Sequence, residues 1–313
     1  MSAPMPPESD LFLSVIIPVY NDFEGLRDTL ESLNTQDVGD DAFEVIVADN
    51  GSTDGTWRKA KQYAHKSQQQ ITVVQEKQIQ SSYAARNRGI EEARGDVFCF
   101  LDADMVAPYD YIRQVSQRFT ETDVDYLAAD VFITTDSSSL TSIYNSVTGF
   151  PVARYLERGH YAPTCCLSVR RDVVESLGNF DSRLESGGDM EFGQRVHAAG
   201  LVQAFAPDVT LHHPPRRTFA SLMNKQKRIG RGHAQLTFYY PARYSLLAQL
   251  YVKTTRYFLP GNPASIHTQC QQRELDVDFP TAFAISTLQI PLAWAGLLAY
   301  LNETRRLLLQ NER

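Results

Sequence analysis

Cysteine is scarce in this chain. Four cysteines occur among 313 residues, and no two of them have the CxxC spacing that is typical of zinc sites. Cys99 lies inside an apolar run, and Cys165 and Cys166 are adjacent, so the cysteines do not read as a disulfide framework. A reducing compartment suits such a sequence, and we expect a cytoplasmic protein.

Positive charge is also in short supply. The chain has 30 Lys and Arg against 37 Asp and Glu, a formal net charge of -7, which argues against nucleic acid as a main partner. The first ten residues are polar, rich in proline and without an apolar run. We therefore expect no secretory signal, and a flexible N-terminus over residues 1–11.

What the chain does have is apolar sequence in a regular order. Hydrophobic residues make up 43% of it, enough for a globular core. Apolar runs typical of buried strands alternate with helical patterns in the first half. The strands are expected at 14–19, 44–48, 71–74 and 97–101, and the helices at 26–33, 56–66 and 82–93. This alternation predicts an α/β fold with a mostly parallel sheet and helices on both faces.

The second half is more mixed. Strands are expected at 126–134, 164–169 and 209–213. A helix is expected to begin near Asp189, with Phe192, Val196 and Ala199 on one face. A basic helical stretch, residues 216–231, follows the last strand.

An acid pair stands directly behind the apolar run 97–101. Asp102 and Asp104 would emerge at the carboxyl end of a buried strand, where open α/β sheets bind ligands. Two carboxylates so close repel each other unless a cation or a proton lies between them. A divalent metal that also holds a substrate phosphate is the expected cation, because such metals prefer oxygen ligands.

Two other strand ends carry polar loops. Pro18, Tyr20 and Asn21 follow the first strand, and Asp49 and Asn50 follow the second. A tyrosine there can stack on a flat base, and Asp and Asn oxygens can accept from base N–H groups or ribose hydroxyls. Turn formation and helix capping explain the same residues, with Asn21 or Asp22 as the cap, so both interpretations stay open.

These segments, in this order, resemble the family 2 glycosyltransferases of the GT-A fold. The resemblance covers roughly residues 12–235. The residues that carry it are Pro18-Val19-Tyr20-Asn21, Asp49-Asn50-Gly51-Ser52-Thr53-Asp54-Gly55-Thr56, Ala85-Arg86-Asn87, Leu101-Asp102-Ala103-Asp104, Arg170-Arg171, Gly178-Asn179-Phe180-Asp181 and Gly187-Gly188-Asp189-Met190-Glu191-Phe192.

The resemblance implies transfer of a sugar from a nucleotide-diphosphate donor, in polysaccharide or glycoconjugate biosynthesis. It assigns base and ribose binding to Tyr20, Asp49 and Asn50, helped by Pro18 and Asn21. Arg86 is expected at the diphosphate or sugar, with a solvated helix face as the alternative. Many relatives have Asp where Asn50 stands, so UDP, GDP and dTDP sugars all stay open as donors.

The metal is expected to be Mn²⁺ or Mg²⁺. By the resemblance, Asp104 is its direct ligand, and Asp102 contacts the ribose or nucleotide and contributes to the metal site. A histidine late in the domain often adds a further ligand. His213, which precedes Pro214, fits that position best, with His212 as the fallback. Without the family, two adjacent histidines are more often structural.

Asp189 falls on the position of the general base of an inverting displacement. The Glu that usually precedes it is replaced by Gly188, so Glu191 is the fallback base. A helix N-terminus favours the ionised carboxylate that a base needs. A plain N-terminal helix acid is the alternative for Asp189. A retaining transferase, a non-catalytic GT-A scaffold and a haloacid-dehalogenase-like phosphatase using Asp102 are the alternative functions.

The tail after residue 235 is predicted to be a helical extension. Residues 281–301 carry no charge and are about as long as a membrane helix, but they include Pro291 and several polar residues. The segment packs on the catalytic domain, lies at a membrane interface together with basic residues 216–231, or spans the bilayer. We divide the chain into a nucleotide-binding half (12–120), an acceptor half (121–235) and this extension (236–313). Glycans, lipid-linked acceptors and small molecules all suit the acceptor half. We expect the protein in the cytoplasm, in association with the inner face of a membrane.

Overall fold

The computed structural model describes residues 11–39, 41–135, 139–252 and 254–311. The chain folds into two compact units. The first consists of the described residues up to Val131, together with Val152–Phe180 and Phe192–His212. The second consists of Phe132–Pro151, Asp181–Glu191 and the residues from His213 onward.

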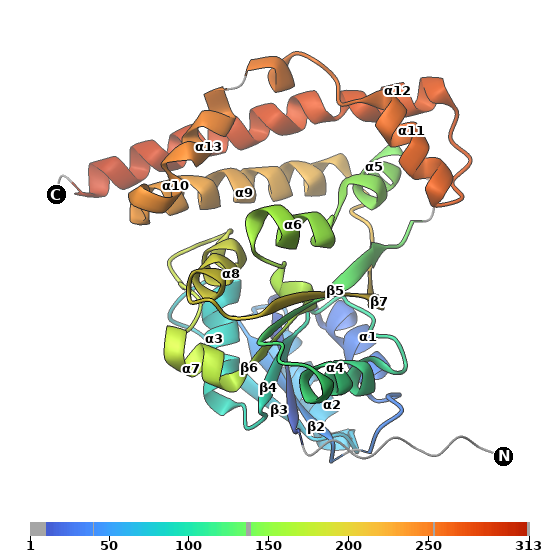
Figure 1. Cartoon of the computed structure of the whole chain (residues 1–313), viewed down its shortest axis with the longest axis vertical. Coiled ribbons are helices and arrows are strands. Elements are labelled where there is room, and N and C mark those ends of the chain that lie inside the picture. The colour runs from blue at the N-terminus through green and yellow to red at the C-terminus, as the bar shows by residue number, and fades with distance from the viewer. Residues whose placement is uncertain (1–10, 40, 136–138, 253, 312–313) are drawn as a thin grey trace. The chain divides into compact units, whose positions relative to one another are not determined.

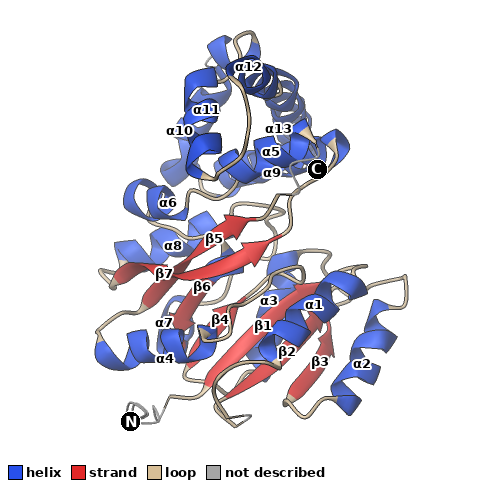
Figure 2. Cartoon of the chain, turned by 90° about the vertical axis from the view of Figure 1, so that its right-hand side faces the viewer, coloured by secondary structure: helices blue, strands red, loops and turns tan. Residues whose placement is uncertain are grey.

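The first unit is built on a seven-stranded sheet (Figures 1 and 2). The strands, in their order across the sheet, are β3 (Ile71–Gln75), β2 (Phe43–Asp49), β1 (Leu13–Val19), β4 (Val97–Phe100), β6 (Leu167–Arg170), β5 (Tyr126–Ile133) and β7 (Gln203–His213). The first four pair in parallel, whereas β6 runs antiparallel to both β4 and β5. This is the mixed, mostly parallel sheet that the sequence predicts.

Helices flank this sheet (Figure 2). They are α1 (Phe23–Leu33), α2 (Thr56–Lys66), α3 (Ser82–Glu92), α4 (Tyr111–Glu121), α6 (Val152–Gly159), α7 (Arg171–Leu177) and α8 (Gly188–Ala198), whose first residues belong to the second unit. In α1, Leu26, Leu30 and Leu33 are buried on one face, as their spacing predicts. The cap is Asp22, whose carboxylate accepts from the Gly25 N–H at 3.0 Å.

The register of the parallel strands positions the site. Val19 at the end of β1 lies beside Asp49 at the end of β2, and Asp49 lies beside Gln75 at the end of β3. Strand β4 pairs with β1 on the other side and is followed at once by Leu101 and Asp102. Parallel strands end at the same edge, so the polar loops after β1, β2 and β4 share the carboxyl edge of the sheet.

The second unit is helical. Its elements are α5 (Leu140–Thr148), α9 (Phe219–Tyr239), α10 (Pro241–Val252), the 3₁₀ turn η2 (Thr254–Tyr257), α11 (Pro263–Gln272), α12 (Phe279–Thr287) and α13 (Gln289–Asn311). Helices α9 and α13 lie side by side (Figure 1). They run in the same direction, since Gly230 meets Gly296 and Gln235, further along α9, donates to Glu303, further along α13. The helical extension is thereby confirmed.

Three predictions of local structure need correction. Residues Thr164–Cys166 form a 3₁₀ turn, η1, and only the following residues form strand β6. The last strand begins at Gln203, well before the predicted start, because its first half is largely half-buried or exposed and includes Pro207 and Asp208, so it shows no apolar run. Ala199 lies just beyond α8 and is exposed, so it does not belong to the buried face of Phe192 and Val196.

The apolar stretch 281–301 is not one straight helix. It is divided at Leu288 between α12 and α13. Pro291 explains the break: it has no N–H to donate, and its ring would collide with the carbonyl of Thr287, four residues earlier. In the first turn of a new helix a proline costs nothing, because that N–H has no partner in any case.

Candidate active site

A small cavity opens beside the second strand end. It has a volume of about 370 Å³ and is lined by Asn50–Ser52 from the loop after β2 and by Gln75–Gln80 from the loop after β3. The sequence predicts that the loop from residue 49 to 56 holds a base and a ribose. The structure adds the second wall, residues 75–80, which the sequence interpretation missed.

Asp49 is fully buried at the head of this loop. Its Oδ1 atom accepts from the N–H groups of Gly51 and Ser52 and from the side chain of Gln75, at 2.8–3.1 Å. Its Oδ2 atom is buried and has no hydrogen-bond partner in the described part of the chain. A buried carboxylate oxygen without a donor is costly. A ligand N–H or hydroxyl would satisfy it.

Asn50 is held on both sides of its amide. Its Nδ2 donates to the carbonyl of Ile79 at 2.8 Å, and its Oδ1 accepts from Gln80 at 3.0 Å. The side chain is buried, so it ties the loop after β2 to the loop after β3. Asn50 therefore shapes the cavity wall, and one of its two amide hydrogens stays available for a ligand.

The loop after β1 is joined to the loop after β2. Asn21 has a positive φ of 53°, and its Oδ1 accepts from the N–H of Thr53 at 2.7 Å, while its own N–H donates to Ser52 at 2.9 Å. Tyr20 stands beside it and is 49% exposed, which leaves its ring accessible for stacking. Pro18 is buried within β1, opposite Ala48, so it shapes the strand end.

The acid pair lies beside a buried cation. Arg86, on α3, is 3% exposed and its Nη2 atom contacts Asp102 Oδ1 at 2.5 Å. Arg86 also donates to the Ser82 carbonyl, and its Nε is buried without a partner among the described residues. The prediction that Arg86 belongs to the site is compatible with this geometry, and a solvated helix face is wrong for it. The Asp102 side chain remains 38% exposed.

The donor atoms of the pair suit a hard cation. Asp102 and Asp104 are both partly exposed at the sheet edge and offer only carboxylate oxygens. Within the described residues, no group of three or more His, Cys, Asp or Glu side chains forms a closed metal cage. Two partly exposed carboxylates fit a Mg²⁺ or Mn²⁺ ion that takes its other ligands from water and phosphate oxygens.

Asp189 and Glu191 occupy the first turn of α8, in the second unit. Asp189 is partly exposed and its Oδ1 accepts from the N–H of Met190 at 3.0 Å. Glu191 is buried and lies 3.6 Å from Arg243. Asp189 is therefore the more accessible of the two carboxylates.

Tyr240 belongs to the surroundings of Glu191. Burial, its hydrogen bond to Asp181 and the charge of Glu191 raise the pKa of Tyr240 to about 12. Burial opposes ionisation of Asp181, but the bonds from Arg183 and Tyr240 outweigh it and lower its pKa. The sequence interpretation missed this polar cluster, although Asp181 stands in one of the segments that carry the family resemblance.

The two histidines differ in their environment. His213 is buried, its Nδ1 lies 2.6 Å from the Pro214 carbonyl, and its ring lies 5.5 Å from that of Phe150. A hydrogen bond donated by Nδ1 to this carbonyl would place the acceptor lone pair of the ring on Nε2. His212 is exposed, and its backbone pairs with Val106.

A mixed sheet with an acid pair behind the central strand β4 and a polar cavity at the ends of β2 and β3 fits a glycosyltransferase of the GT-A fold. The model of "Glycosyl transferase family 2" matches residues 14–178. The glycosyltransferase AglE of Haloferax volcanii is 36% identical over 226 residues, which cover 72% of this chain and 74% of that protein. The chain belongs to glycosyltransferase family 2.

Solved structures agree with this fold. A mannosyltransferase of Pyrobaculum calidifontis, in complex with GDP-Man and Mn²⁺, superposes with a TM-score of 0.62 at 18% identity and covers 92% of this chain and 86% of that one. TarS of S. aureus in complex with UDP superposes with a TM-score of 0.54 at 16% identity, covering 95% and 90%. The predicted fold class and enzyme class are confirmed.

Proposed function

We propose that this enzyme transfers a sugar from a nucleoside diphosphate to an acceptor hydroxyl, with the nucleotide at the carboxyl edge of β1, β2 and β4. The observation that carries the proposal is the unsatisfied Oδ2 of Asp49, buried beside a polar cavity on the edge that also bears the acid pair. A nucleoside supplies the N–H and hydroxyl donors that this edge needs.

On the donor side, Tyr20 and Asp49 bind the nucleotide base. Pro18, Asn21 and Asn50 hold the surrounding loops in position. Asp102, held by Arg86, faces the ribose or diphosphate. UDP, GDP and dTDP sugars all offer an N–H to Asp49. Bound GDP-Man and UDP in the two solved relatives support a nucleotide-sugar donor of this kind.

Mn²⁺ or Mg²⁺ is the proposed cofactor. Asp104 and Asp102 would hold the ion, and Nε2 of His213 is the further candidate ligand, with His212 as fallback. Mn²⁺ in the mannosyltransferase complex supports this choice. Once bound, such an ion neutralises the charge that develops on the departing diphosphate.

On the acceptor side, we assign the general base to Asp189, with Glu191 as fallback. The acceptor oxygen bonds to the anomeric carbon while the bond from that carbon to the diphosphate oxygen breaks. The bonding electrons leave with the nucleoside diphosphate, and the hydroxyl proton passes to Asp189. A base on the side opposite the leaving group gives inversion; a retaining reaction is the alternative.

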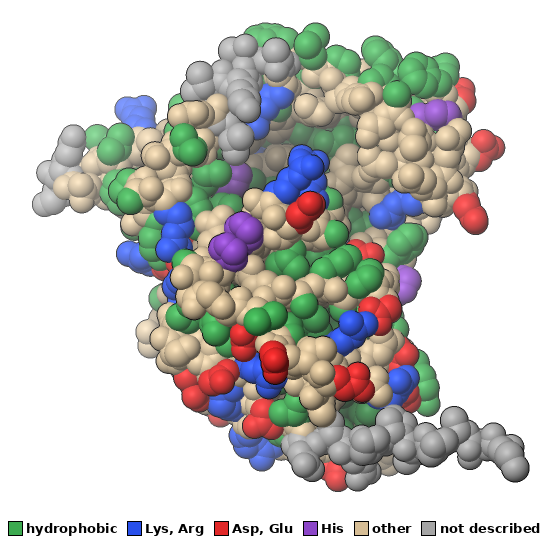
Figure 3. All heavy atoms as spheres, viewed as in Figure 1, with side chains coloured by type: hydrophobic (Ala, Val, Ile, Leu, Met, Phe, Trp, Pro, Cys, Tyr) green, Lys and Arg blue, Asp and Glu red, His purple; other side chains and the backbone are tan. Residues whose placement is uncertain are grey.

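The rest of the proposal concerns organisation. We propose residues 12–235 as the catalytic domain, with the nucleotide in its first half and a glycan, lipid-linked or small-molecule acceptor in its second. The apolar segment 281–301, together with basic residues 216–231, would lie against the inner face of a membrane. In support, Phe279 and Phe283 expose about half of their surface, and hydrophobic side chains gather on the surface over α12 (Figure 3).

Length and composition would also let the stretch Phe279–Asn311 cross a membrane, with 44% of its most apolar window buried in protein. Sedimentation with anionic vesicles separates surface contact from a span. Surface binding is expected to be released by high salt, whereas a spanning helix would stay with the lipid.

The donor is tested by thermal shift. UDP, GDP and dTDP are each added with and without Mn²⁺, since a ligand that binds only the folded state raises Tm. One nucleotide is expected to raise Tm only when Mn²⁺ is present. In Asp104→Asn, this rise of Tm with nucleotide and Mn²⁺ is expected to disappear. Asp123→Asn, an exposed carboxylate between α4 and β5, is the matched control. A shift that survives in Asp104→Asn would contradict the metal assignment.

A further inference from the structure

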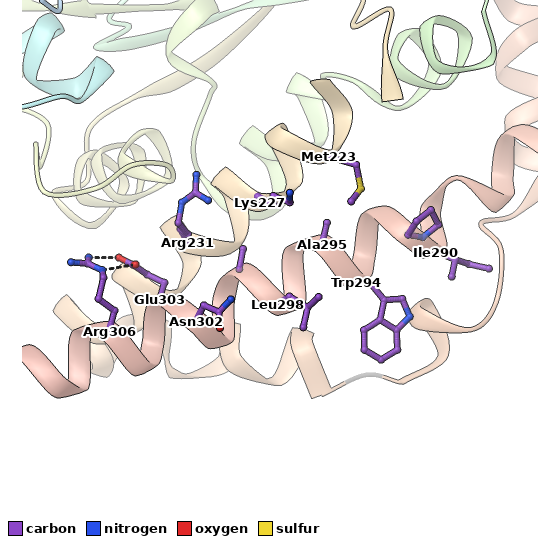
Figure 4. A pocket seen from close by; sticks show the side chains of 12 residues that line it. Met223, Lys227, Arg231, Ile290, Trp294, Ala295, Leu298, Asn302, Glu303 and Arg306 are labelled. Carbon is purple, nitrogen blue, oxygen red and sulfur yellow. Dashed lines mark hydrogen bonds and ion pairs between the residues drawn. The ribbon is translucent and has the colours of Figure 1, made fainter. Parts of the chain in front are cut away.

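A groove runs between α9 and α13 in the helical unit (Figure 4). It has a volume of about 850 Å³, within the range of pockets that enclose small organic ligands. All of its lining residues come from these two helices. None of them takes part in the transfer reaction proposed above.

The groove is polarised along its length. Met223 lies in its first part, with Ile290 and Trp294, and Leu298 follows on α13 (Figure 4). Arg231 and Arg306 stand at the opposite end (Figure 4). Because the two helices run in the same direction, the lining residues of each pass from apolar to charged along the same direction of the groove.

The apolar part is preformed. Trp294 is 38% exposed, and its indole N–H donates to the Tyr257 carbonyl at 3.0 Å, which fixes the ring. Phe258 packs edge-on against it, with ring centroids 5.9 Å apart. Leu298 exposes 55% of its surface along the same wall. A hydrocarbon chain laid here would bury apolar area without first ordering the protein.

The polar end favours an anion. Three cationic side chains line the groove, Lys227, Arg231 and Arg306, against one carboxylate, Glu303. Glu303 is already satisfied by Gln235 and Arg306.

Donors remain available on these cations. Arg231 binds Glu185 through Nε and Nη2, which leaves the two N–H groups of Nη1. Lys227 makes no ion pair within the described residues. A phosphate would accept hydrogen bonds from Arg231 Nη1 and from Lys227, and both contacts would be charge-assisted.

We propose that this groove binds a single lipid phosphate molecule, with its phosphate at Lys227 and Arg231 and its hydrocarbon chain along Trp294 and Leu298. A neutral lipid would leave Lys227 without an anionic partner, and a free phosphate would leave the apolar wall in water. The inference stands on the helical unit alone, so it holds or fails independently of the sugar-transfer proposal.

The test uses Trp294 as the reporter. The chain has two tryptophans, so Trp57→Phe leaves Trp294 as the sole one. Dodecyl phosphate is titrated below its critical micelle concentration, with dodecanol and inorganic phosphate as comparison ligands. A saturable change in Trp294 fluorescence is expected with dodecyl phosphate, and at least about tenfold weaker binding with either comparison ligand.

Matched variants separate the groove from the general surface. Lys227→Gln and Leu298→Gln are each expected to weaken binding about tenfold. Their controls are Arg228→Gln and Leu301→Gln, exposed neighbours on the same helices that do not line the groove. Calorimetry with the unaltered chain repeats the measurement without the Trp57 change.

Three results would overturn the proposal. The first is binding of dodecanol or inorganic phosphate as tight as that of dodecyl phosphate. The second is an equal effect of Lys227→Gln and Arg228→Gln, and the third is a response that starts only with micelles or vesicles. The last two would each mean adsorption to a charged apolar surface rather than binding in the groove.

Discussion

Arg86 illustrates what burial adds to a residue that sequence alone leaves ambiguous. Its spacing before the acid pair fits a solvated helix face as well as a site residue. In the structure it is buried against Asp102, and one of its nitrogens has no partner among the residues described. A cation held this way lowers the repulsion between Asp102 and its neighbour Asp104, and it presents positive charge where a diphosphate would arrive.

The first prediction concerns this arginine. Arg86→Lys keeps the charge but cannot contact both Asp102 and the Ser82 carbonyl through a planar fork. We expect a loss of about 1–2 kcal/mol in the free energy of unfolding by urea, and weaker nucleotide binding by calorimetry. Arg88→Lys, on the exposed face of the same helix, should cost about 0.5 kcal/mol or less. Equal effects of the two changes would contradict the role of Arg86.

The second prediction separates the two carboxylates of α8. Asp189→Asn should lower kcat about 10²–10⁴-fold while donor binding persists, because an amide cannot accept the proton. Glu191→Gln removes the charge facing Arg243 from a buried position, so its main effect should fall on stability. Initial rates and donor titrations measure both. Near-normal kcat in Asp189→Asn would show that another group is the base.

At the scale of elements, glycine decides how α9 and α13 pack. A Cβ atom on Gly230 would lie 2.2 Å from the Gly296 carbonyl oxygen, whereas a Cβ on Gly296 would meet nothing closer than 3.5 Å. The two facing glycines are therefore not equivalent. One is required by the close approach of the helices, and the other is not.

The third prediction follows from this asymmetry. Gly230→Ala should destabilise the protein by about 1–3 kcal/mol, because the helices must separate. Gly296→Ala should be neutral or stabilise by up to about 1 kcal/mol, through the better helix propensity of alanine. Thermal unfolding of the two variants measures the difference. The same sign for both would contradict the packing seen here.

At the scale of the whole molecule, the chain passes repeatedly between the sheet unit and the helical unit. Segments 132–151 and 181–191 group with the C-terminal helices, although sheet residues surround them in the sequence. The helical unit has its own buried clusters, one of which contains Ala234, Tyr251 and Tyr300.

The fourth prediction concerns the pH dependence of this unit. Burial, and then the charge of Arg256, lower the pKa of His233 from 6.5 to about 4. The unfolded chain therefore binds the proton more tightly than the folded one between these values. The contribution of His233 to the free energy of unfolding is therefore fully present above pH 6.5. It is lost as the pH falls from 6.5 to about 4, and the pKa difference corresponds to about 3 kcal/mol.

Urea unfolding between pH 4 and 7 checks this, with His233→Phe as the comparison. The variant should lack this part of the slope, since phenylalanine does not titrate. His65→Phe, an exposed histidine on α2, is the control and should leave the slope unchanged. A slope that is the same in His233→Phe would mean that other groups cause the acid sensitivity.

The sequence by itself determined the strands, the helices and the strand-end loops of the first half. Buried strands need unbroken apolar runs, helices need the 3.6-residue period, and parallel strands bring the polar loops behind them to one edge of the sheet. These local patterns are enough to predict Asp49, Asp102, Asp104 and their neighbours as one site.

Only the tertiary structure decided the rest. It showed that Arg86 is buried, that residues 75–80 form a cavity with the loop after β2, that Pro291 divides the apolar tail, and that α9 and α13 frame a polarised groove. Each of these depends on which side chains from distant segments meet. Local periodicity does not predict these contacts between distant segments, because burial and pairing are properties of the folded chain and not of any single stretch of it.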